Sequence, residues 1–260
     1  MFFGKRKFLD PEVEEWHVEC WRFLLRNFGG VARVKAAPLA LPTASYFPQV
    51  PGAPHERAEA VFLRIKELMG MAEWPAQLVE RYANNAQVAE FAMVRSERPV
   101  AGTFQTDGRQ VIITYDPGLV ARPYNLIAMF AHELAHYRLH TIEELPPGAD
   151  VEPMIEELAT EMAVAYFGFA LIAANGAFSF EQFQDFGRQG WRGGPSGYFS
   201  EDGWVFALAV FLGLRDESPE TAKKHLKEHL AKRLDVALKH LAQNPAIMEA
   251  VRAPDDHARD

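Results

Sequence analysis

Cysteine is almost absent from this chain of 260 residues, since Cys20 is the only one. A single thiol cannot form an intramolecular disulfide, and it excludes zinc ribbons and zinc fingers, which need several thiolates. Positive charge is also in short supply, with 27 Lys and Arg against 35 Asp and Glu and a formal net charge of −8. Nucleic-acid binding, which normally requires a basic face, is therefore not expected.

Long apolar segments are missing as well. The longest uncharged apolar runs, 162–174 and 204–214, are shorter than the roughly 20 residues that a membrane-spanning helix needs. No apolar stretch with a small-residue cleavage site follows the basic start of the chain, so we expect no export signal. These absences predict a cytoplasmic protein that works without a membrane. Hydrophobic residues, at 48%, are sufficient for a proper globular core.

The hydrophobic pattern predicts one α+β domain over residues 1–242, mostly helical, and a polar tail over 243–260. Within the domain we expect an N-terminal helical and extended part at 1–74, a core at about 75–215 and a C-terminal helix at 219–241. Caps and apolar periodicity predict further helices at 11–27, 55–69, 125–140, 152–174 and 201–214. The proline-rich stretch 31–54 is expected to be extended. Two strand-like runs, 100–106 and 110–115, flank Asp107-Gly108 and predict a β-hairpin.

One segment matches a pattern that carries metal chemistry: residues 132–136 read HELAH, which fits HExxH. On a helix, His132 and His136 are about 40° apart around the axis and about 6 Å apart along it, so both imidazoles can reach one metal ion. Glu133 can then reach a water on that metal and act as the general base. Only about 0.03 chance matches are expected in a chain of this composition. The alternative is a buried histidine pair satisfied by hydrogen bonds.

A catalytic zinc ion takes three protein ligands and leaves one position open. Without a usable cysteine, the third ligand must be His, Glu or Asp, and the helix predicted at 152–174 offers Glu156, Glu157 and Glu161. Glu157 and Glu161 share an otherwise small and apolar face, where two acids would be costly without a cation. Gly168 and the nearby alanines predict a close approach of this helix to the HExxH helix. We expect one zinc ion per chain.

The arrangement resembles zinc metallopeptidases of the gluzincin type, over about residues 98–170. Those enzymes carry HExxH and, on a following helix, a glutamate ligand and then an aspartate that supports a ligating histidine. The resemblance implies a zincin-like fold with a small β-sheet packed on the HExxH helix. It also implies zinc ligands at His132, His136 and Glu157, a general base at Glu133, and a supporting carboxylate at Glu161. The difference is that Glu161 stands where the family has aspartate.

Two further roles are suggested by the same class of enzyme. Zincins typically present an exposed edge strand above the metal, to which an extended peptide adds by backbone hydrogen bonds. Val111, Ile113 and Tyr115 are the candidates here, and the alternative is an ordinary strand that closes the sheet. Tyr198 is a candidate donor to a developing oxyanion, or else a core aromatic. The glycine-rich segment 187–197 would be a lid or a plain connector.

Two other histidine patterns are not expected to form a metal site. His140 follows His132 by about 12 Å of helix rise, which is too far for both to bind one ion. His225 and His229 belong to an inverted HxxEH pattern, but lysines surround them, and the 31 residues after His229 leave no third acidic ligand well downstream. We predict that this pair lies on the surface.

The sequence therefore predicts a zinc-dependent peptidase that acts on a peptide or protein. The alternative is a catalytically silent protein that keeps a zinc-stabilised fold and binds or regulates a partner. Glu133 favours the enzyme, because a scaffold has no need of a general base.

Overall fold

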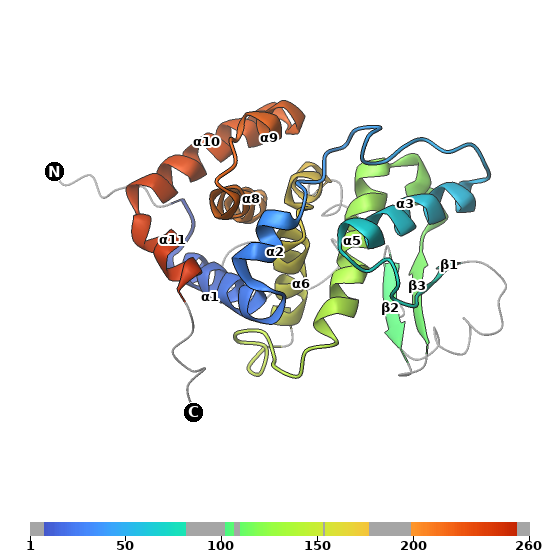
Figure 1. Cartoon of the computed structure of the whole chain (residues 1–260), viewed down its shortest axis with the longest axis horizontal. Coiled ribbons are helices and arrows are strands. Elements are labelled where there is room, and N and C mark those ends of the chain that lie inside the picture. The colour runs from blue at the N-terminus through green and yellow to red at the C-terminus, as the bar shows by residue number, and fades with distance from the viewer. Residues whose placement is uncertain (1–7, 82–101, 107–109, 153, 177–198, 254–260) are drawn as a thin grey trace.

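The computed structural model describes residues 8–81, 102–106, 110–152, 154–176 and 199–253, and over these the protein is a mostly helical α+β structure (Figure 1). The helices are α1 (Pro11–Asn27), α2 (Gly30–Ala36), α3 (Pro54–Leu68), α5 (Pro123–Leu139), α6 (Met154–Tyr166), α8 (Glu201–Arg215), α9 (Glu220–His225), α10 (Glu228–Gln243) and α11 (Pro245–Arg252). The strands are β1 (Gln77–Glu80), β2 (Gly102–Thr106) and β3 (Val111–Tyr115), and a 3₁₀ turn, η1 (Pro117–Ala121), leads into α5. Residues 170–176 are also helical.

Helix α5, which carries the HExxH motif, lies between the sheet and helix α6 (Figure 1). Helix α3 and strand β2 pack on one side of α5, and α6 packs on the other. Helices α1 and α8 contact α6, while α10 and α11 pack outside them. The motif is therefore held on the central helix of the described structure, in contact with both its sheet and its helical part.

The local signals at the helix starts explain why several predicted helices are confirmed. The side chain of Asp10 accepts a hydrogen bond from the backbone N–H of Glu12 at 3.0 Å, and Pro11 occupies the first turn of α1. Ser200 caps α8 in the same way, through the N–H of Gly203 at 3.1 Å. The helices α1, α3, α5 and α8 agree with the predicted bounds to within two residues.

The sheet has the strand order β1-β3-β2, in which β1 is parallel and β2 antiparallel to β3. The predicted pairing of the hairpin strands is confirmed, and the Asp107-Gly108 turn lies outside the described residues. The prediction that β3 is an exposed edge strand is wrong, because β1 and β2 occupy both of its edges. Val111, Ile113 and Tyr115 therefore cannot offer their backbone to a substrate. The pairing of β1 with β3 could not be predicted from the sequence, because β1 has only four residues and lies more than 30 residues before β3 in the chain.

The helix predicted at 152–174 ends early, at Tyr166. Gly168 follows with a φ of +91°, and a Cβ atom there would collide with the carbonyl oxygen of Pro38. Its own carbonyl accepts a hydrogen bond from the N–H of Ala40 at 2.9 Å. The predicted packing of α6 on the HExxH helix is confirmed. Gly168, however, allows a close approach to the segment after α2 and not to α5, so the role predicted for it is wrong.

Three other segments differ from the prediction. Helix α2 begins at Gly30 and covers the start of the stretch 31–54 that was expected to be extended. Helix α11 forms within the expected polar tail, where Val251 is buried. The helix expected at 219–241 is broken between α9 and α10. At the break, the side chain of Asn175 donates to the carbonyl of His225 at 2.7 Å and accepts from the N–H of Lys227 at 2.9 Å.

One large hydrophobic cluster runs through the described chain, from Phe8 to Val251, and Val79 and Ile112 form a separate small one. The large cluster includes fully buried aromatic side chains on α1, α5 and α8, such as Trp21, Phe130 and Phe206. Burial of such side chains supplies the main stabilisation of the fold. In the part of the chain that the structure describes, no helix is both long enough and apolar enough to cross a membrane.

Candidate metal centre

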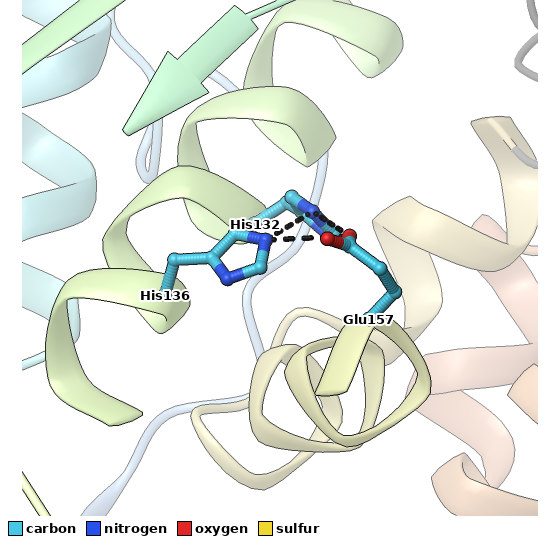
Figure 2. A group of neighbouring side chains, drawn as sticks. All are labelled: His132, His136 and Glu157. Carbon is cyan, nitrogen blue, oxygen red and sulfur yellow. Dashed lines mark hydrogen bonds and ion pairs between the residues drawn. The ribbon is translucent and has the colours of Figure 1, made fainter. Parts of the chain in front are cut away.

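The two histidines of the HExxH motif point from α5 toward α6, where Glu157 points back at them (Figure 2). The Nε2 atoms of His132 and His136 are 3.0 Å apart. Each of them lies 3.4 Å from Oε2 of Glu157. Within the described residues, these three side chains are the one group of His, Cys, Asp or Glu side chains close enough together to hold a metal ion.

The spacing of the three atoms suits a small tetrahedral ion. Bonds of about 2.0–2.1 Å at tetrahedral angles place the ligand atoms of zinc about 3.3 Å from one another. The observed separations of 3.0, 3.4 and 3.4 Å are close to this value. Two neutral imidazoles and one carboxylate, with a fourth position left for solvent or substrate, are a donor set that zinc accepts. The residues present therefore fit such an ion.

The electrostatics of the group favour a positive charge at its centre. Burial lowers the pKa of His132, but the carboxylates of Glu161 and Glu157 outweigh this effect and hold the pKa well above its usual value. Burial raises the pKa of Glu157, yet its contacts with His132 and His136 hold that pKa well below its usual range. A metal cation would satisfy the same preference, and it would displace the proton from His132 on binding.

Each histidine is also supported from behind, through its Nδ1 atom. Oε1 of Glu161 lies 3.3 Å from Nδ1 of His132, as an ion-pair contact rather than an aligned hydrogen bond. Oγ1 of Thr160 lies 3.2 Å from Nδ1 of His136. Partners of this kind fix the ring orientation and leave Nε2 free to bind a metal.

Glu133 stands apart from the three ligand atoms. Its side chain is buried, and its charge raises the pKa of His132, so the carboxylate lies near that ring. Glu156, the neighbour of Glu157, is exposed. Of the three glutamates that the sequence offers as a third ligand, the structure brings Glu157 to both Nε2 atoms and Glu161 to the back of one ring. The side chain of Glu157 is 44% exposed, so the group is open to solvent.

The remaining predicted residues lie elsewhere. His140 is exposed at the end of α5. His229 is exposed and pairs with Glu201 at 3.1 Å, while the helix break after His225 separates the two histidines of the inverted pattern. Tyr198 and the segment 187–197 lie outside the described residues.

Sequence reasoning missed Thr160. Its side chain is fully buried, and its hydroxyl donates to the carbonyl of Glu156 at 2.8 Å. A signal was present, because Thr160 lies three positions after Glu157 and therefore on the same side of the helix. A buried hydroxyl among alanines, next to a predicted ligand, needs a polar partner.

Comparisons of this chain with protein families, with curated proteins and with solved structures give no match. The likeness to gluzincins thus remains a prediction from the motif. The evidence for the site is its geometry.

Proposed function

We propose that this protein is a zinc-dependent peptidase whose metal ligands are His132, His136 and Glu157. The observation that carries the proposal is the convergence of their three ligand atoms, with separations of 3.0, 3.4 and 3.4 Å. A structural zinc site normally has four protein ligands, whereas a catalytic site has three and an open position. Three protein ligands beside an exposed carboxylate edge therefore favour catalysis over a structural role.

The chain supplies one further group that the reaction needs. Zinc, when bound, would act as a Lewis acid toward water and toward the carbonyl of the scissile bond. Glu133 lies on the helix turn between the two histidines, and its carboxylate would take a proton from the attacking water. The same carboxylate can return that proton to the nitrogen of the leaving amine. Because Glu133 is buried, bulk water would have little access to its carboxylate and would compete little with it for that proton.

The supporting residues hold the histidines in the required form. Glu161 orients His132 and Thr160 orients His136, so that both Nε2 atoms face Glu157. Because neutral imidazole binds metal and imidazolium does not, these contacts also set which nitrogen carries the proton.

The test is to measure zinc content and peptide-bond cleavage on the same preparations of the wild type and Glu133→Gln. An amide cannot accept the proton, so the variant should keep its zinc and its fold and lose at least a hundredfold in cleavage rate. His229→Ala is the matched control, because it removes an exposed histidine on α10 that pairs with Glu201 and is not part of the metal group, and it should leave cleavage unchanged.

Full cleavage by Glu133→Gln would assign the activity to another base or to a contaminant. A wild type that holds zinc and cleaves neither casein nor short peptides would instead support the zinc-stabilised binding protein.

A further inference from the structure

A second cluster of charged side chains lies at the far end of α5, around Arg138. The guanidinium of Arg138 lies over three aromatic rings, with its carbon 4.6 Å from the ring centre of Trp74, 4.9 Å from that of Phe28 and 5.7 Å from that of Phe167. Among the described residues it makes no hydrogen bond and no ion pair. Its Nε atom is buried without an acceptor. An arginine carries five N–H donors, and buried donors nearly always have a partner.

A second arginine shares this aromatic cluster. The guanidinium carbon of Arg33, on α2, lies 5.6 Å from the ring centre of Phe167, and one of its nitrogens donates to the carbonyl of Met69 at 3.0 Å. No carboxylate of the described chain lies within ion-pair distance of Arg33 or Arg138. Two half-buried positive charges thus lie against one ring, and the described part of the chain supplies no carboxylate to pair with them.

The geometry restricts what can satisfy these groups. Aromatic rings cover faces of the Arg138 guanidinium, so a ligand must approach the N–H donors at its edge. The ligand must accept hydrogen bonds and carry negative charge, because the cluster already has two cations. A phosphate group carries close to two negative charges and tetrahedral oxygens, which can reach two guanidinium groups at once, whereas a carboxylate has one charge and one plane.

We propose that Arg33 and Arg138 bind the phosphate group of a small molecule, at a site framed by Phe28, Trp74 and Phe167. Arg138 lies two positions after His136, which is about 200° around the helix. The site therefore faces away from the metal ligands and is separate from the proposed active centre. A phosphate bound there would connect α2, the segment after α3 and the end of the HExxH helix.

The experiment is isothermal titration calorimetry of the full chain with inorganic phosphate at constant ionic strength. The wild type should bind one phosphate per chain with a saturable isotherm, and acetate should bind at least tenfold more weakly. Arg33→Gln and Arg138→Gln should each weaken phosphate binding at least tenfold. Arg57→Gln, which removes an exposed arginine on α3, is the matched control and should bind like the wild type. Circular dichroism checks that each variant is folded.

Two measurements keep the test decisive. Because Arg138 packs among aromatic rings, its variant can lose its fold, whereas Arg33→Gln changes a different helix and tests the same site. Phosphate should also change the fluorescence of Trp74, and the change should saturate at the same phosphate concentration as the calorimetric isotherm.

The proposal is independent of the peptidase activity, and His132→Ala separates the two. That variant should lose zinc and keep phosphate binding. Phosphate binding that disappears in His132→Ala, or that survives in both arginine variants, would overturn the site. A wild type with no saturable phosphate isotherm, or with equal affinity for acetate, would also overturn it.

Discussion

The hydroxyl of Thr160 lies between the backbone carbonyl of Glu156 and Nδ1 of His136, at 2.8 Å from the first and 3.2 Å from the second. A hydroxyl has one proton, and here it is donated to the carbonyl. Nδ1 of His136 must then be the donor in the second contact. This assigns the proton of the neutral ring to Nδ1 and leaves the lone pair on Nε2, the atom that faces Glu157.

Thr160→Val should therefore weaken zinc binding by about tenfold, the lower end of the range for such supporting partners. Valine has nearly the same shape, so the fold should be retained. Thr160→Ser keeps the hydroxyl and should restore most of the affinity. The measurement is a competition titration with a zinc chelator. Equal affinities for the valine and serine variants would show that the hydroxyl does not act on His136.

The identity of the third ligand can be tested with neighbouring glutamates. Glu157→Ala should lose most of the zinc affinity, because it removes a ligand atom. Glu156→Ala should have no effect, since that side chain is exposed on another side of α6. Glu161→Ala should fall between them, with a loss of about 10–100-fold. Zinc retained by Glu157→Ala and lost from Glu161→Ala would reverse the assignment.

The buried His17 on α1 should make stability depend on pH. Its ring is stacked with Phe199 at 4.9 Å between centres, and burial lowers its pKa to about 3. Above the unfolded pKa of about 6.5, both states are neutral and the group adds no pH dependence. Below about pH 6.5, His17 binds a proton in the unfolded chain but stays neutral in the folded chain. The free energy of unfolding therefore falls as the pH drops toward 3.

The expected size of this effect is about 2 kcal/mol between pH 7 and pH 5. Urea unfolding of the wild type and His17→Phe at both pH values isolates it, since phenylalanine keeps the aromatic contacts and cannot titrate. The wild type should lose about that much more stability than the variant. Parallel losses in the two proteins would mean that His17 is protonated in the fold.

Gly168 should be the least replaceable of the glycines with positive φ in the described chain. Its φ of +91° is unfavourable for other residues, and a Cβ atom would meet the fixed backbone of Pro38. Gly168→Ala should cost more than about 2 kcal/mol of unfolding free energy. Gly30 also has a positive φ, +67°, but its nearest neighbour is 3.9 Å from the Cβ position, so Gly30→Ala should cost only about 1 kcal/mol. Urea denaturation compares the two, and equal losses would contradict the steric argument.

The parts of the fold that were predicted correctly depend on local signals. Asp10 and Pro11 begin α1, and the spacing of His132 and His136 needs only the period of one helix. The parts that were missed depend on distant partners. The side chain of Asn175 stabilises a helix break some 50 residues later in the chain, and Gly168 ends α6 against Pro38.

The candidate metal centre also combines features that local sequence predicts with features that depend on distant partners. Glu157 and Glu161 could be proposed from their spacing on one helix, but which of them faces Nε2 depends on how α6 is rotated against α5. That rotation is set by tertiary packing, including the contacts of α6 with α1 and α8. The place of β3 at the centre of the sheet likewise depends on β1, whose four residues carry no clear pattern.

The connection between α5 and α6 bears on the order in which the protein could assemble during synthesis. A zinc ion held by His136 and Glu157 would close a chain ring of only about 20 residues, and short rings lose little entropy on closure. This connection is fastened to α1, which is made earlier, through Trp16 to the carbonyl of Pro147 and through Arg26 to Glu144. Every ligand and both supporting residues would thus be available before residues 199–253 are translated. The nascent chain would thus hold all of its ligand residues before α8 is made, and the packing of α8 on α6 would follow.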